Sequence, residues 1–454
     1  MSSQSSRAVW WISPTAIALV VGSLSLIPTV FISDQEFRAL WRSARTLDNA
    51  TVAMFGSGVL VLALAALIGM TLVRRRPVAR GEWPPMQPNT LALLVRASSV
   101  MFGLTVFGYL GFGYLIAKSG ITPAELLNAT AADGTPTKDA IGTIAGVTTL
   151  TQFGVPAVVV AALVLTQGKS RRQIGIITAV MLLAIGRAYV FSERLAVLEL
   201  VVPLAVIGSA YLGNRSRRGN VLAQWIPLAS LPVLLLVFGL FEYFRSWSFY
   251  RTRTSNSFVQ FAADRLAGYY ATAINNGQII YDNMRWPGRV PYDTLEVVWT
   301  APGIQHVYST LPPHRSAFPL GPSDYRPLLA QHGNPEFNNP SGYTGPFTDY
   351  GHFGGLVYFA IAGIIVGVTY RAFCNGSLIG MLMYPVMFTG LLEMPRYLYW
   401  AQGRAAPAWV GLLLVAYLAT RVKTRVNKSR NPGPSDAPDS STYLTVSQPG
   451  GVTR

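Results

Sequence analysis

Long apolar runs are the feature that most limits how this chain of 454 residues can fold. Runs near eighteen residues or longer recur throughout, and an α-helix needs about that length to cross roughly 30 Å of hydrocarbon. Hydrophobic residues make up 51% of the chain and charged residues only 12%, which is too few charges for a soluble protein of this length. The sequence therefore predicts an all-α polytopic membrane protein.

We predict about ten transmembrane helices, seven before a long polar loop and three after it. Their ranges are 12–32, 50–73, 90–117, 141–166, 173–190, 195–212, 224–244, 351–370, 377–394 and 404–420. The first run follows a weakly basic segment and has no small-residue cleavage site, so we interpret it as a span and not as a signal peptide. The predicted parts are seven helices in 1–244, the loop in 245–350, three helices in 351–426, and a disordered Pro-, Ser- and Gly-rich tail in 427–454.

Basic residues are concentrated in every second connection between these spans. Clear examples are Arg74, Arg75 and Arg76 after the second span and Arg215, Arg217 and Arg218 after the sixth. Connections of this kind face the cytoplasm, so both termini are predicted to be cytoplasmic and the large loop extracytoplasmic. The net charge of +16 has this topological origin, and nucleic acid is not an expected partner.

The large loop carries one signal for a longer helix and many against others. Ser257 with Gln260 fits a helix capping box, and apolar residues at helical spacing predict an amphipathic helix to about Tyr281, lying on the bilayer surface. From Trp286 to Pro346 the recurring prolines favour short helices in irregular backbone. The four histidines lack metal-site spacing and Cys374 is the single cysteine, so we expect neither a metal site nor an internal disulfide.

The predicted topology brings charged ends of four spans to the extracytoplasmic interface. These residues are Arg187, Glu193, Arg194, Glu242, Arg245, Glu393 and Arg396. Glu199 lies nearly two turns into the sixth span, where an ionised carboxylate needs a partner. Arginine forks match phosphate oxygens, which favours a lipid-linked diphosphate as ligand. The alternatives are arginines that snorkel to headgroups and a helix start in which Ser192 caps and Glu193 complements the dipole.

A polar, glycine-bearing stretch over residues 338–355 leads from the loop into the eighth span. Its glycines allow close approach of the backbone to a ligand. The alternative is an ordinary helix start capped by Thr348 or Asp349.

Two short motifs and the span pattern resemble one family over roughly residues 180–400. The motifs are Arg187 with Ser192-Glu193-Arg194-Leu195 between two spans, and Asp349-Tyr350-Gly351 followed by Gly354-Gly355 after the large loop. They are similar to Wzy-type polymerases, which are also known as O-antigen or oligosaccharide repeat-unit polymerases. The resemblance implies a GT-C-like glycosyltransferase that joins repeat units carried on undecaprenyl diphosphate at the outer face of the bacterial cytoplasmic membrane.

For this glycosyl transfer, the chemical type of each residue suggests its role. The candidates for binding the diphosphate are Arg187, Arg194, Arg265 and Arg396, and His352 is a further substrate-binding candidate. The candidates for a base or for orienting the sugar are Glu193, Asp264 and Asp349, and those for stacking on sugar faces are Tyr269, Trp299 and Tyr343. No cofactor is expected because the donor is already activated. The expected partners are the lipid-linked donor and acceptor, membrane lipid and a chain-length regulator.

Two alternatives stay open from the sequence. An O-antigen ligase or a polyprenyl-phosphate-sugar transferase would use related chemistry. A transporter or flippase of lipid-linked oligosaccharide belongs to another class, and it is disfavoured because transporters place substrate near the midplane, whereas the ionisable residues here gather at one face.

Overall fold

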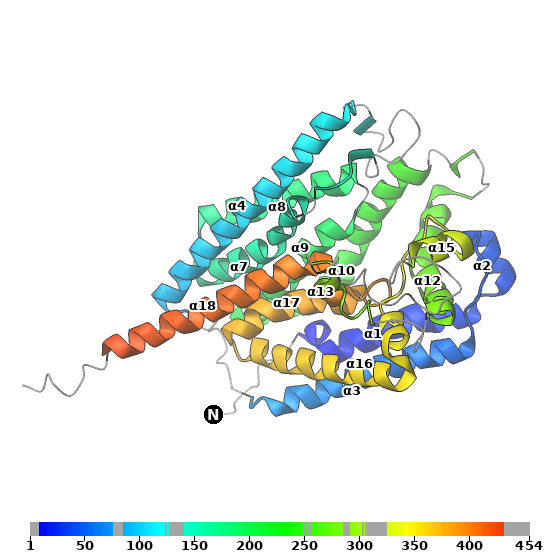
Figure 1. Cartoon of the computed structure of the whole chain (residues 1–454). Helices are drawn as coiled ribbons and strands as arrows, with labels where there is room; N and C mark the ends of the chain where they lie inside the picture. The colour runs from blue at the N-terminus through cyan, green and yellow to red at the C-terminus, as the bar shows by residue number, and fades with distance from the viewer. Residues whose placement is uncertain are drawn as a thin grey trace, which may run out of the picture.

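The computed structural model describes residues 9–75, 85–122, 125–126, 140–144, 146–191, 193–247, 250–252, 256–284, 291–301, 304 and 325–430, and these residues form helices and irregular backbone without a strand (Figure 1). In this part of the chain nine helices are long and apolar enough to cross a membrane. The prediction of an all-α polytopic membrane protein is therefore confirmed.

The helices follow the predicted spans in order. They are α1 (Pro14–Phe31), α3 (Asn49–Leu72), α4 (Pro88–Ser119), η2 with α7 (Thr148–Phe153 and Gly154–Gln167), α8 (Arg171–Val190), α9 (Leu195–Arg215), α10 (Arg217–Glu242), α16 (Thr344–Cys374), α17 (Leu378–Glu393) and α18 (Ala406–Arg430). The helix α17 has 16 residues, most of them buried, so it is the ninth predicted span in a shorter, protein-enclosed form.

Four boundaries differ by seven or more residues from the sequence prediction. The seventh span begins at Arg217 and not at 224, and the tenth continues to Arg430 and not to 420, which extends it into the predicted tail. The fourth span begins at Thr148 and not at 141, because residues 142–144 are not helical. The eighth begins at Thr344, seven residues before 351, and Gly351 interrupts it with a φ of 73°. Glycine adopts this left-handed conformation without the steric cost of a Cβ. The predicted start therefore coincides with a break inside α16.

The helices α3 and α16 pack along each other with their backbones in contact. A Cβ atom on Gly363 would collide with the Leu62 carbonyl oxygen, and one on Gly367 with that of Ala66. Small residues permit such close approach, which membrane helices use because lipid supplies no hydrophobic drive for their association. On the other side of the bundle α7 is almost wholly enclosed, with every residue from Gly154 to Val164 buried.

The alternate connections separate to opposite ends of the bundle. At one end, here termed the basic end, Arg371 Nε donates to the Met70 carbonyl oxygen at 3.1 Å and Asn375 Nδ2 to that of Arg74 at 3.0 Å. The other end, here termed the loop end, carries α2 (Asp34–Trp41), α12 (Phe258–Met284) and α15 (Arg326–His332), which lie together in Figure 1, away from the C-terminal end of α18.

A long helix, α12, organises the loop end. It starts after Ser257, whose Oγ accepts from Gln260 N at 3.3 Å, as the capping pattern predicts. The predicted placement on a bilayer surface is wrong for its second half, since residues 271–280 are buried without interruption. Asn275 Oδ1 accepts from Thr46 N at 2.8 Å, and Asn276 Nδ2 donates to the Phe337 carbonyl oxygen at 2.7 Å. These buried amides hold the segments that precede α3 and α16.

The described residues within 286–343 form only short helices, α13 (Glu296–Trp299) and α15, as the prolines predict. Further short elements at the loop end are η3 (Tyr243–Trp247), η4 (Tyr399–Ala401) and η5 (Gly403–Ala405). Ser192, His306, His314 and the predicted tail from residue 431 onward lie outside the described residues.

Candidate active site

The predicted arginines gather at the loop end in two groups, of which the first surrounds Glu242 at the end of α10. Glu242 is 0% exposed and lies between two arginines. Arg194, at the start of α9, donates to Glu242 Oε1, and Arg265 Nε of α12 lies 3.1 Å from Glu242 Oε2. Arg265 also donates to Glu336 in the segment before α16. These four charged residues, their aromatic neighbours and Arg396 are together termed the α12 cluster.

Aromatic rings cover the guanidinium groups of the α12 cluster. The Arg194 Cζ atom lies 4.6 Å from the ring centre of Phe238 and 5.5 Å from that of Tyr269. Arg396 Cζ lies 5.8 Å from the same Tyr269 ring, and Arg396 Nη1 lies 3.1 Å from Glu393 Oε2. Cations over aromatic faces are attracted by the ring quadrupole, more strongly where water is excluded. The Tyr269 ring therefore contacts two of the predicted phosphate-binding arginines, Arg194 and Arg396.

The second group, termed the α9 cluster, is built on Glu199. This carboxylate is 2% exposed, and Arg404 at the start of the last span holds it with two contacts, Nε to Oε1 at 2.8 Å and Nη2 to Oε2 at 3.2 Å. With its amide nitrogen toward Glu199, Gln152 donates to Oε2 at 3.3 Å and accepts from Arg187 Nη1 at 3.1 Å. Arg187 Nη2 lies 2.7 Å from Glu193 Oε2, which completes the cluster. Glu199 thus has the partner that its depth requires.

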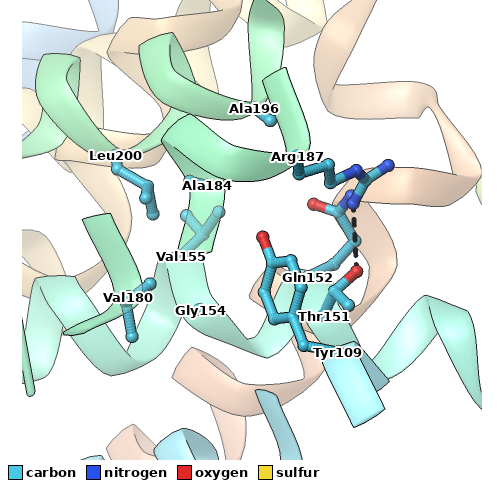
Figure 2. A pocket seen from close by; sticks show the side chains of 10 residues that line it. All are labelled: Tyr109, Thr151, Gln152, Gly154, Val155, Val180, Ala184, Arg187, Ala196 and Leu200. Atoms are coloured by element: carbon cyan, nitrogen blue, oxygen red, sulfur yellow. Dashed lines mark hydrogen bonds between the residues drawn. The ribbon is translucent and has the colours of Figure 1, made fainter. Parts of the chain in front are cut away.

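A small pocket opens beside Arg187 between α4, α7, α8 and α9 (Figure 2). Tyr109, Thr151 and Gln152 stand near the guanidinium group, and Arg187 Nη1 donates to Thr151 Oγ1 at 3.0 Å. Val180 and Leu200 form the opposite, apolar wall. The α9 cluster therefore borders a cavity that is polar on one side and apolar on the other.

The three predicted bases have different surroundings. The Glu193 side chain is 38% exposed and pairs with Arg187. Burial raises the pKa of Asp264, and a hydrogen bond from Asn256 Nδ2 at 3.4 Å lowers it. Asp349 is 0% exposed and accepts from Tyr292 N at 3.0 Å and from Thr294 N and Oγ1 at 2.8 Å.

The hydrogen bonds of Asp349 show what this carboxylate does structurally. Its donors belong to residues 292–294 of the large loop, so Asp349 fastens that segment to α16. This differs from the capping that was the alternative reading, since a cap accepts from the first turn of its own helix. Thr348 Oγ1 donates back to the Gly345 carbonyl oxygen at 2.9 Å, inside the same helix.

The predicted sugar-stacking residues are only partly available. Tyr343 is 2% exposed and packs toward Phe55 with ring centres 6.3 Å apart, so it leaves no face free in this conformation. Trp299 is half-buried, and its Nε1 donates to the Pro291 carbonyl oxygen at 3.0 Å. The His352 ring stacks on Phe347 at 5.8 Å. Tyr269 is half-buried between Arg194 and Arg396 and is the best placed of these rings.

Sequence reasoning missed three charged residues at this end, namely Glu296, Glu336 and Arg404. Arg404 had a readable signal, because it stands at the loop-end start of the last span. Glu296 follows Asp293 by three residues, yet nothing in that spacing distinguishes it from other loop carboxylates. Among the described residues, no group of three or more His, Cys, Asp or Glu could hold a metal ion.

Glu296 belongs to α13 and faces the start of α18. Gly403 N donates to Glu296 Oε1 at 3.4 Å. The pKa of Glu296 is raised to about 7 because burial and the charge of Asp293, which raise it, outweigh the Gly403 bond and the charges of Arg404 and Arg326, which lower it. A carboxyl group with this pKa exchanges protons near neutral pH.

Comparisons with known proteins give no match: no family model, no curated protein and no solved structure is similar to this chain. The fold and the site define a polytopic helical membrane protein with a layer of ion-paired arginines at one end of its bundle.

Proposed function

We propose that the protein is a membrane glycosyltransferase that joins undecaprenyl-diphosphate-linked oligosaccharide repeat units into a polysaccharide. The observation that carries this proposal is the arginine layer at the loop end, formed by Arg187, Arg194, Arg265, Arg396 and Arg404. Lysine would serve for topology alone, whereas the planar guanidinium fork matches two phosphate oxygens at once.

The reaction needs cationic stabilisation of a leaving group. A sugar hydroxyl of one lipid-linked unit attacks the anomeric carbon of another chain, the bond from that carbon to the diphosphate breaks, and its electron pair leaves on the lipid diphosphate. Preorganised charges next to this group lower the barrier without reorganisation at the moment of reaction. The activated donor supplies the free energy, so the proposal involves no soluble cofactor.

The carboxylates that hold the arginines fall into two kinds. Glu199 and Glu242 are almost fully buried, so they keep Arg404, Arg194 and Arg265 in place. By contrast, the side chains of Glu193 and Glu336 are 38% and 41% exposed. A carboxylate that stays in contact with water costs less to release from its arginine than a buried one. A diphosphate can therefore displace these two carboxylates and take over Arg187 and Arg265.

The reaction is proposed to take place at the outer face of the bacterial cytoplasmic membrane, with both termini in the cytoplasm. Support comes from the separation of the two bundle ends, since the basic connections after α3, α9 and α16 lie opposite the arginine layer. Short basic connections face the cytoplasm. Donor, acceptor and membrane lipid would meet at the loop end, and a chain-length regulator is the candidate protein partner.

Chain-length analysis of the glycan from a deletion strain tests the proposal. Loss of a polymerase leaves single repeat units that are still exported and attached. Loss of a ligase leaves long chains that stay on the lipid carrier, and loss of a flippase abolishes export. Wild-type glycan chain lengths in the deletion strain would contradict the proposed function.

A further inference from the structure

Residues 291–301 of the large loop are fastened to the bundle at several points. Asp349 of α16 accepts from the backbone of Tyr292 and Thr294, and Gly403 N donates to Glu296 Oε1. A Cβ atom on Gly403 would collide with Thr300 Oγ1, so only glycine allows α13 and η5 to approach this closely. The segment is thereby fixed between α16 and the start of α18.

Glu296 differs from Asp349 and Glu193 in its hydrogen-bonding partners. Both oxygens of Asp349 accept hydrogen bonds, and Glu193 is paired with Arg187. Within the described part of the chain, one oxygen of Glu296 accepts a hydrogen bond, from Gly403 N, and no described residue donates to the other. The Glu296 residue is half-buried, so part of it remains in contact with solvent.

The neighbours of Glu296 place it beside the arginine layer. Gly403 precedes Arg404, which holds Glu199 and through Gln152 is connected to Arg187. The charged groups that act on Glu296 are Asp293 from its own segment, Arg326 at the start of α15 and Arg404 at the start of the last span. A pKa of about 7 means that the carboxylate and carboxylic acid forms are both populated at neutral pH, which suits a general base.

We propose that Glu296 is the catalytic residue that removes the proton from the acceptor hydroxyl, an inference that rests on the proposed glycosyl transfer. The hydroxyl proton passes to the free carboxylate oxygen of Glu296 as the hydroxyl oxygen bonds to the anomeric carbon. The bond from that carbon to the diphosphate breaks, and its electron pair leaves on the diphosphate beside the arginines. Glu296 then releases the proton to water.

The test compares two substitutions at this position in the purified full-length protein in lipid vesicles. The substrates are lipid-linked repeat units extracted from the deletion strain. Glu296→Gln preserves the shape and the acceptor for Gly403 N but cannot take the proton, so the initial rate of polymerisation should fall by about 10² to 10⁴. Asp34→Asn is the matched control, because Asp34 is an exposed carboxylate at the same end that pairs with Arg45, and it should keep the wild-type rate.

The pH dependence separates catalysis from support of the fold. A base works in its deprotonated form, so the wild-type rate should rise with pH through about 7 and then level off. Glu296→Gln should lose this rise, while Glu296→Asp should keep it at a reduced rate. An unchanged rate and pH profile in Glu296→Gln would overturn the role of Glu296 and leave the polymerase proposal intact.

The remaining outcomes are equally decisive. If Glu296→Gln and Glu296→Asp are equally inactive and both unfold at lower temperature than wild type, Glu296 supports the fold and the inference fails. If the wild-type protein forms no polymer from these substrates, the proposed function fails together with the inference.

Discussion

The α12 cluster and the α9 cluster differ in how their carboxylates neutralise neighbouring arginines. Each keeps arginines close together at the loop end, where their charges repel. In the α12 cluster one wholly buried carboxylate, Glu242, is shared by Arg194 and Arg265, and aromatic rings exclude water. In the α9 cluster the buried Glu199 forms its ion pair with Arg404, and the ion-pair partner of Arg187 is the partly exposed Glu193.

This difference indicates which arginines are fixed and which can change partners. An arginine paired with a buried carboxylate cannot exchange it without leaving an uncompensated charge, which is strongly unfavourable. An arginine paired with an exposed carboxylate exchanges it at little cost because water solvates the released group. Glu242 therefore fixes Arg194 in the α12 cluster, whereas Arg265, through Glu336, and Arg187, through Glu193, each have a partly exposed partner that a ligand can displace.

The largest expected effect comes from Glu242→Gln. It leaves the half-buried Arg194 and the buried Arg265 beside a neutral side chain, and breaking a buried pair in this way typically costs about 3 to 5 kcal/mol. Thermal unfolding in detergent should show a large decrease in transition temperature. The comparison variant Glu193→Gln should change stability much less, because the Glu193 side chain is 38% exposed and Arg187 keeps its bond to Thr151. Equal destabilisation by both variants would remove the distinction between the clusters.

Next in size is Asp349→Asn, which we expect to abolish or strongly reduce polymerisation. The amide presents an NH₂ group where Asp349 now accepts from Thr294 or Tyr292, and a buried donor left without its acceptor costs about 1 to 3 kcal/mol. Limited proteolysis should detect loosening of residues 291–301, and the glycan ladder should shorten. Thr294→Val removes only the hydroxyl bond to Asp349, so it should have a smaller effect. Wild-type chain lengths from Asp349→Asn would contradict both its predicted role as a base and its structural role.

A smaller effect is expected when lysine replaces arginine, because the planar guanidinium group is lost but the positive charge is kept. Arg194→Lys and Arg396→Lys should impair polymerisation nearly as much as alanine, since hydrogen bonds to charged groups contribute about 1.5 to 3 kcal/mol, roughly 10- to 100-fold in rate. The assay is the polysaccharide ladder at equal protein abundance. Arg421→Lys is the matched control, because Arg421 lies at the basic end and contacts Tyr417. Full activity of both variants would assign these arginines to topology or lipid anchoring.

The last prediction concerns substitutions with the smallest effect on activity. It tests whether the loop end, which carries both clusters, lies outside the cytoplasm. Cys374 is exposed at the basic end, and Ala263 is exposed on α12 at the loop end. In intact cells a membrane-impermeant maleimide should label the Ala263→Cys variant and leave the wild-type protein, with Cys374 alone, unlabelled. Labelling of Cys374 in the wild type would place the clusters on the cytoplasmic side and overturn the proposed reaction at the outer face.

The sequence by itself determined the class of fold and the grouping of the arginines. The length of the apolar runs and the charge of the connections are local properties, so the ten helices and the two bundle ends could be read without coordinates. The same reasoning brought Arg187, Arg194, Arg265 and Arg396 to one end, where the structure places them.

Only the tertiary structure decided which carboxylate each arginine meets. Glu199 and Arg404 are 205 residues apart in the chain, and their pairing depends on the direction of two side chains at the packed ends of α9 and α18. In the same way, the buried second half of α12 needs segments from residues 44–47 and 337–339 to satisfy its asparagines. Asp349 as a loop anchor and Glu296 beside Gly403 have this origin too, because a hydrogen bond between distant segments leaves no periodic pattern in the sequence.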